Sequence, residues 1–264
     1  MKILIFGDVV GKIGRRALAA AVVAWKKEYT PDFVIANSEN LAHGHGVTPK
    51  TADEVFAAGV DLLTGGDHTV NSQTGAALLS DPGYADRLLR PANCLPGTPG
   101  VGMLAREIGQ NRIIVINLQG RLFMKTPVDD PFAVFDSLWS TIKDQRRTVL
   151  IDFHGEATSE RAAFGWYVDG RASALWGTHT HVPTADERIL PGATAFQTDV
   201  GLTGFRDGVI GFAKEDGIRR LTTGEKGPAI IPEHGPAVAN ALLVETDDAG
   251  RATAVRRLQK FIEI

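Results

Sequence analysis

KILIFGD, residues Lys2 to Asp8, is an apolar run that ends on a carboxylate, and the same pattern recurs along the chain. Four later runs also end on residues that bind metals or move protons: FVIANSEN (33–40), VDLLTGGDH (60–68), RTVLIDFH (147–154) and SALWGTHTH (173–181). Short apolar runs bounded by glycine and polar residues are typical of buried strands. In an open α/β sheet the ligand site lies beyond the carboxyl ends of the strands. If the runs lie side by side, their polar ends meet and form a functional site.

The composition narrows the function class. The chain has 264 residues, of which 44% are hydrophobic and 22% charged, as expected for a soluble globular protein. A net charge of −3 without a basic block argues against a large nucleic acid partner, but a nucleotide substrate stays open. The single Cys94 excludes an internal disulfide. Because we find neither a signal sequence nor an apolar run of ~20 residues, we expect a cytoplasmic protein without membrane contact; self-association stays open.

Strand and helix patterns alternate through the first 180 or so residues. The patterns predict helices over 13–28, 48–58, 71–79, 129–144 and 156–166 and a loop over 90–100. They also predict a strand over 112–120 whose end carries no metal-binding or proton-transferring residue. Thr48 is a predicted N-cap, with Pro49 at the first helical position. Segments 239–246 and 253–264 predict a hairpin. We therefore expect one domain, 1–264, with an α/β core to which the C-terminal part adds antiparallel strands.

Histidines and acidic residues end these runs. His179 and His181 are two residues apart, and on an extended segment this spacing puts both imidazoles on one face. Neutral imidazole is a common metal ligand. Asp8 follows a buried strand and lies too early to cap the next helix, so we interpret it as a metal ligand. For His154 we prefer a ligand to a core histidine bonded to the backbone.

The other two runs carry more varied side chains. Glu39 is a ligand candidate that can bridge two cations, and Asn40 can bind one through its carbonyl oxygen, although asparagine also stabilises turns. Two glycines before Asp67 let the backbone approach a neighbour closely. Asp67 is a further ligand candidate. We assign His68 to catalysis, because consecutive residues tend to point in different directions.

The number of candidate donors predicts more than one metal ion. Asp8, Glu39, Asp67, His154, His179 and His181 make six protein ligands before Asn40 or His68 is added. A hydrolytic site with one metal keeps about three protein ligands and an open position. We therefore predict two ions bridged by Glu39 or Asp67, ~3.5–4 Å apart, a known clamp for in-line displacement at phosphorus. Nitrogen and oxygen donors without thiolate favour iron or manganese, with zinc as a further candidate.

Longer blocks around these residues resemble a known family. They are GDVVGKIGR (7–15), NSENLAHGHG (37–46), GGDHTVN (65–71), RPANCLPGTPG (90–100), INLQGR (116–121), DFHGEATSE (152–160), GWYVDGRASALWGTHTHVPTADERILP (165–191) and TDVGLTG (198–204). Nearly end to end, the chain resembles the YmdB-like branch of the calcineurin-like metallophosphoesterase superfamily. The resemblance implies a four-layer αββα sandwich of the metallophosphoesterase type, a dinuclear iron or manganese site, and hydrolysis of phosphodiesters, notably cyclic nucleotides.

Two positions depart from the patterns that the resemblance implies. In the wider superfamily a histidine stands where this chain has Val10, and Asn40 is the substitute donor; Glu39 corresponds to a bridging Asp. The family's Gly-Asn-His reads Gly-Asp-His here, at Asp67. The Asp67 carboxylate adds a negative charge beside the metals where the family has a neutral amide. This charge should weaken the attraction of the site for phosphate and raise the pKa of metal-bound water.

Our leading hypothesis is a dinuclear metal-dependent phosphodiesterase. A hydroxide bridging the metals would attack phosphorus in line, and His68 would stabilise the transition state or protonate the leaving oxygen. Both 2′,3′- and 3′,5′-cyclic nucleotides are candidate substrates, and no substrate-binding residue is identified. The alternative is a metal-stabilised regulatory module that binds a nucleotide or a protein with little turnover. A metal-dependent amidohydrolase barrel ranks lower, because its HxH lies on the first strand.

Overall fold

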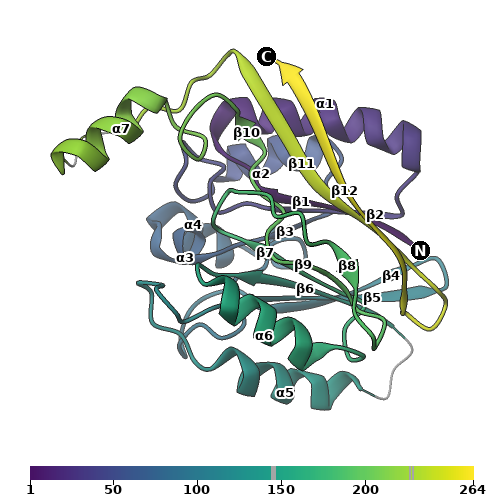
Figure 1. Ribbon diagram of the computed structural model, residues 1–264. Coiled ribbons are helices and arrows are strands. Elements are labelled where there is room, and N and C mark those ends of the chain that lie inside the picture. The colour runs from purple at the N-terminus through teal and green to yellow at the C-terminus, as the bar shows by residue number, and fades with distance from the viewer. Residues whose placement is uncertain (144–146, 226, 228) are drawn as a thin grey trace.

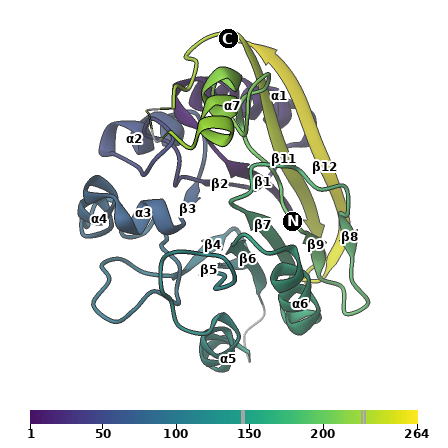
Figure 2. The same ribbon diagram turned by 60° about the vertical axis from the view of Figure 1, so that its left-hand side comes forward.

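The computed structural model describes residues 1–143, 147–225, 227 and 229–264 (Figure 1). Two sheets pack face to face, and helices cover their outer faces. The turned view shows α1 and α2 above one sheet and α5 and α6 below the other (Figure 2). The four-layer αββα sandwich predicted from the family resemblance is therefore confirmed.

The first sheet combines parallel and antiparallel strands. Its six strands are β10 (Gly204–Phe205), β11 (Pro236–Thr246), β12 (Ala252–Glu263), β1 (Lys2–Asp8), β2 (Phe33–Asn37) and β3 (Leu62–Thr64). β1, β2 and β3 run parallel, whereas β11 lies antiparallel to both β1 and β12. The predicted C-terminal hairpin is confirmed as β11 and β12.

The second sheet also has six strands. They are β4 (Met103–Ile108), β5 (Asn111–Gln119), β6 (Thr148–His154), β7 (Ala174–Thr178), β9 (Ala195–Gln197) and β8 (Arg188–Ile189). β5, β6, β7 and β9 run parallel. The patterns did not predict β4, which pairs antiparallel with β5.

Successive helices connect or flank these strands. They are α1 (Gly11–Tyr29), α2 (Pro49–Ala57), α3 (Asp67–Asn71), α4 (Gln73–Leu79), α5 (Pro131–Ile142), α6 (Thr158–Val168) and α7 (Lys214–Thr223). α7 projects away from both sheets in Figure 1. Among the described residues, no helix combines the length and apolar character needed to traverse a lipid bilayer.

Alternate side chains of β1 enter different hydrophobic layers. Ile3 and Ile5 pack between the two sheets, in a cluster that includes Val115 of β5. Leu4 and Phe6 pack on the other face of the sheet, in a cluster that includes Leu18 of α1. Because both faces of the strand are buried, its sequence is continuously apolar rather than alternating. This burial fixes the strand register and so the place where Asp8 emerges.

One helix boundary near the site differs from the sequence prediction. The helix expected over 71–79 is two helices, α3 and α4, separated at Ser72. The backbone of Ser72 is extended, with ψ of 136°, and its hydroxyl accepts the Gly75 N–H. Asp67 and His68 lie in the first turn of α3, ahead of residue 71, where the predicted helix begins.

The other predicted helices differ mainly at their ends. The helix predicted over 129–144 spans Pro131 to Ile142, and the predicted end at Asp144 lies outside the described residues. The helix predicted over 156–166 begins at Thr158. The cap of α2 is confirmed, because the Thr48 hydroxyl accepts the Thr51 N–H and Pro49 opens the helix.

Candidate metal centre

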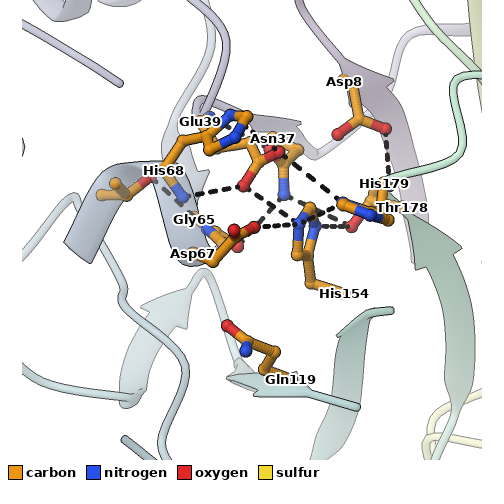
Figure 3. A network of polar contacts seen from close by, with 12 residues as sticks. Asp8, Asn37, Glu39, Gly65, Asp67, His68, Gln119, His154, Thr178 and His179 are labelled. Atoms are coloured by element: carbon orange, nitrogen blue, oxygen red, sulfur yellow. Dashed lines mark hydrogen bonds and ion pairs between the residues drawn. The ribbon is translucent and has the colours of Figure 1, made fainter. Parts of the chain in front are cut away.

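The polar strand ends meet at one edge of the interface between the two sheets. Asp8 and His154 are the last residues of β1 and β6, Asp67 follows β3, and His179 follows β7. The apolar runs thus converge as predicted, but from two facing sheets rather than from one. Figure 3 shows Glu39, Asp67, His154 and His179 pointing toward one another. One donor atom from each of these four residues lies within 4.8 Å of all the others.

His154 lies at the centre of this four-donor cluster. Its Nε2 is 3.0 Å from Glu39 Oε2 and 3.5 Å from Asp67 Oδ1. The same nitrogen is 3.1 Å from His179 Nδ1. Four atoms with lone pairs thus face a common point, an arrangement that binds either protons or a cation.

The outer nitrogen of His154 is fixed by a buried relay. The Thr178 hydroxyl donates to Asp152 Oδ1 at 2.8 Å, so its oxygen accepts the Nδ1–H of His154 at 2.9 Å. Asp152 also accepts hydrogen bonds from Asn37 and Thr64. The relay leaves the Nε2 lone pair of neutral His154 directed into the cluster, as metal-binding histidines require.

The other two histidines are oriented in the same way. Nε2 of His179 is 3.3 Å from Glu156 Oε2, so it donates outward and leaves Nδ1 facing the cluster. Nδ1 of His181 donates to the carbonyl oxygen of Ile210 at 2.8 Å. Because a carbonyl only accepts, Nε2 of neutral His181 keeps its lone pair.

A second group of donors adjoins the cluster. The Asn40 amide nitrogen donates to Glu39 Oε1 at 3.2 Å and lies 3.1 Å from His181 Nε2. Asp8 Oδ2 accepts the backbone N–H of His179 at 2.9 Å. The oxygen of Asn40 faces His68 Nδ1 at 3.1 Å, so ligation through that oxygen requires the amide to turn over.

The backbone of the His-Thr-His segment differs from the sequence prediction. His179 has φ of 106° and His181 has φ of 66°, so neither residue is extended. The prediction that both imidazoles share one face of an extended segment is therefore wrong. His179 joins the four-donor cluster, whereas His181 faces Asn40.

His68 lies beside the cluster rather than within it. Its Nδ1 is 3.6 Å from Glu39 Oε1, and its ring stacks on His45 with centroids 4.3 Å apart. About a third of the side chain, 33%, is exposed. Asp67 and His68 point in different directions, as expected for consecutive residues.

Burial and neighbouring charges shift the ionisation of the site in opposite directions. Burial raises the pKa of Asp8 to about 7, although His181 and His154 oppose the shift. Burial also disfavours ionised Glu39, but the charge and hydrogen bond of His154 lower the pKa of Glu39 below its usual range. The same balance lowers the pKa of Asp67.

The two neighbouring imidazoles titrate apart. Burial disfavours the charged form of His154, but Glu39 and Asp67 raise its pKa well above the usual value. Burial and the charge of His154 lower the pKa of His179 to about 4. Of these two rings, His154 is therefore the one that is protonated in the metal-free protein, and His179 is neutral.

The residues of the site fit divalent cations. Among the described residues, Asp8 Oδ1 is buried without a hydrogen-bond partner, and Asp67 Oδ1 has only the 3.5 Å ion-pair contact with His154 Nε2. Carboxylate and imidazole donors suit iron, manganese or zinc. A Cβ at Gly66 would overlap Glu39 Oε2 and His154 Nε2, so glycine is needed for the backbone to pass the donors.

Sequence reasoning missed several residues that support the site. Asp152 lies two residues before His154 on β6, so the two share a strand face, and this spacing could have revealed Asp152. Gln119 pairs in register with His154, so β5 does end on a polar residue. Thr178 and Glu156 gave no comparable signal, because their contacts depend on the orientation of the imidazole rings.

The chain is similar to known proteins over nearly its whole length. Residues 4–258 match the model of the YmdB-like protein family. A 2′,3′-cyclic-nucleotide 2′-phosphodiesterase of Bacillus subtilis (strain 168) is 42% identical over 259 residues, which cover 98% of this chain and 96% of that protein. The crystal structure of a hypothetical protein from Thermus thermophilus has a TM-score of 0.90 at 38% identity, with 99% of each chain covered. A novel phosphatase from Mycoplasma pneumoniae has a TM-score of 0.92 at 31% identity, with 100% and 94% covered.

Proposed function

The chain belongs to the YmdB-like protein family, and we propose that it is a dinuclear metal-dependent phosphodiesterase that hydrolyses cyclic nucleotides. The observation that carries the proposal is the convergence of Glu39, Asp67, His154 and His179 within 4.8 Å, beside a second group of donors. The activity printed for the Bacillus subtilis relative supports 2′,3′-cyclic nucleotides as the first substrates to test.

We assign one ion to each group of donors. Glu39, Asp67, His154 and His179 would hold the first ion, and Asp8, Asn40 and His181 the second. Two divalent ions, when bound, offset the charge of a phosphodiester and lower the pKa of water.

Glu39 is the better candidate for the bridging carboxylate. Its Oε2 faces His154 at 3.0 Å, and its Oε1 faces Asn40 at 3.2 Å, so its two oxygens address different groups. Asp67 Oδ1 faces His154 at 3.5 Å, on the first group's side. Of the two carboxylates that the sequence left open, the geometry therefore favours Glu39.

We assign proton transfer to His68. The stack on His45, with ring centroids 4.3 Å apart, restrains the ring at a partly exposed position, and in the metal-free protein its Nδ1 also bonds Asn40 Oδ1. A protonated ring can donate from Nε2 to the leaving oxygen of the diester, which becomes a hydroxyl group. General acid catalysis of this kind typically contributes ~10²–10⁴-fold to the rate.

Metal analysis combined with a substrate panel tests this function. Purified protein reconstituted with manganese or iron should bind two ions per chain and hydrolyse cyclic nucleotides. Removal of the metal by a chelator should abolish turnover, and its return should restore it. At most one ion per chain would overturn the dinuclear assignment. Tight nucleotide binding with slow turnover of every diester would overturn the enzymatic proposal in favour of a regulatory module.

A further inference from the structure

The two histidines that follow β7 have a backbone conformation that needs outside support. His179 and His181 both have positive φ, and the residue between them is Thr180. Non-glycine residues in this region are strained and persist only where the surrounding structure holds them. The contacts of Thr180 therefore bear on the placement of both imidazoles.

Asp199 holds Thr180 at two points. Its Oδ2 accepts the backbone N–H of Thr180 at 3.2 Å and the Thr180 hydroxyl at 2.7 Å. Its Oδ1 accepts the Gly201 N–H at 2.8 Å. Asp199 is fully buried, so these bonds form away from competing water.

Arg161 fixes Asp199 from α6. Its Nη1 is 2.8 Å from Asp199 Oδ2, and its Nη2 donates to the carbonyl oxygen of Thr178 at 3.0 Å. One guanidinium group thus joins the residue before His179 to the carboxylate that holds Thr180. Both charged side chains are almost completely buried, at 1% and 0% exposure. A buried ion pair gives little net stability compared with an apolar filling, so stability alone is a weak explanation for its presence.

The flanking residues are anchored to other segments. The His179 N–H donates to Asp8 Oδ2 at 2.9 Å, a contact that Figure 3 draws. The carbonyl oxygen of His181 accepts the Leu202 N–H at 3.1 Å. Asp199 is therefore the central support of a strained segment that is also held on either side.

We propose that Asp199, anchored by Arg161, is a positioning residue that holds Thr180 so that His179 and His181 each face a different ion. This inference rests on the proposed function, because it takes both histidines to be metal ligands. One support then sets the affinity of both ions together. Loss of a residue that orients metal ligands typically weakens metal binding by ~10–100-fold.

Thr180→Val removes the 2.7 Å hydroxyl contact with Asp199, together with a long 3.5 Å bond that the same hydroxyl accepts from the Val182 N–H. The substitution removes the hydroxyl donor but keeps the β-branched shape, the backbone bond to Asp199 and the buried ion pair. We expect it to raise the dissociation constants of both manganese ions by ~10-fold or more. Thr180→Ser restores the hydroxyl and should return both constants to the wild-type values. The measurement is competition with a chelator of known affinity, together with the unfolding temperature of the metal-free protein.

Asp186→Asn is the matched control. Asp186 accepts the N–H of Thr198 at 3.1 Å and its hydroxyl at 2.6 Å, so it braces the residue next to Asp199. The substitution should lower the unfolding temperature at least as much as Thr180→Val and leave both manganese constants unchanged. The larger change Asp199→Asn should weaken both ions further.

The wild-type titration separates the possible failures. If the wild type binds two ions and Thr180→Val binds them equally well, the positioning role is overturned. Equal loss of affinity in Thr180→Val and Asp186→Asn would also overturn it, because the effect would then be general destabilisation. A wild type that binds neither manganese nor iron would overturn the proposed function itself.

Discussion

Asp8 and Glu39 lie at the ends of neighbouring parallel strands and are both buried, yet their pKa values shift in opposite directions. Burial raises the pKa of Asp8 to about 7. The pKa of Glu39 is lowered instead, because His154 lies 3.0 Å from its carboxylate and offsets the cost of burial. The difference shows that a charged neighbour, rather than depth in the fold, decides whether these carboxylates are ionised.

The two halves of the site consequently differ in what they lack. The half around Glu39 carries its own positive charge on His154 in the metal-free protein. The half around Asp8 holds a buried oxygen, Asp8 Oδ1, without a hydrogen-bond partner among the described residues. A bound cation would therefore displace the proton of His154 in the first half and, below about pH 7, the proton of Asp8 in the second.

Glu39→Gln should have the largest effect, because Glu39 contacts both halves. The neutral amide removes the charge that we assign to both ions. We expect the loss of at least one ion and a fall in kcat/KM of roughly 10³-fold or more, since metal catalysis supplies several kcal/mol. Elemental analysis and cyclic nucleotide hydrolysis measure both effects. A variant that keeps two ions and wild-type turnover would show that the halves are not joined through Glu39.

His68→Ala should lower activity while leaving the metal content of both halves intact. His68 contacts Asn40 and stacks on His45, outside the four-donor cluster. Loss of a proton donor should reduce kcat by ~10²–10⁴-fold. Elemental analysis of the same preparation is the control. If an ion is lost as well, His68 is a ligand and its assignment to proton transfer is wrong.

Asp8→Asn tests, in the metal-free protein, whether burial keeps the Asp8 carboxyl protonated up to about pH 7. The pKa of Asp8 rises from 3.8 to about 7 on folding, so the stability that protonated Asp8 contributes is lost as pH rises from about 4 to about 7. The asparagine variant has no such proton. In metal-free protein it should gain up to roughly 4 kcal/mol relative to the wild type between about pH 4 and pH 8.

In the same experiment, Glu39→Gln should change the stability of the metal-free protein in the opposite direction. The lowered pKa of Glu39 contributes stability that is present above pH 4.5 and lost as pH falls further. The metal-free variant should therefore be less stable than the wild type near neutral pH. Urea unfolding across this pH range measures both differences, and shifts of the same sign for the two variants would contradict the comparison.

Asp67→Asn should have the smallest effect, a change of charge within the first half alone. Three carboxylates against two divalent ions leave a formal charge near +1, and the amide raises it to about +2. The pH–rate profile should rise at lower pH, and free phosphate should inhibit more strongly, with metal saturating. The lowered pKa of Asp67 indicates that its charge is present to be removed. An unchanged profile and unchanged inhibition would show that Asp67 does not contact the ions.

The strand ends could be predicted from sequence because burial fixes them. Asp8 and His154 end apolar runs whose two faces are both covered, and each is the last residue of its strand. The four-layer arrangement itself came from the family resemblance, since apolar runs alone do not show that the strands divide between two sheets. The family resemblance also extended over all the sequence blocks that contain the candidate site residues.

Other features depend on contacts between segments that are distant in sequence. His179 and His181 have positive φ in a segment where Asp8 accepts the His179 N–H and Asp199 accepts the Thr180 N–H, and nothing in the local sequence indicates this conformation. The break at Ser72 requires its hydroxyl to cap α4, which a pattern of apolar residues does not reveal. The choice between Glu39 and Asp67 as the bridge depends on which neighbours their oxygens face.

Anomalous scattering from a crystal of the protein with manganese would show directly whether Glu39 bridges two ions. We expect two peaks per chain, ~3.5–4 Å apart, with Glu39 contacting both. One peak should lie among Asp67, His154 and His179, and the other beside Asp8 and His181. A single peak, or two peaks bridged by Asp67 with Glu39 on one ion alone, would contradict it.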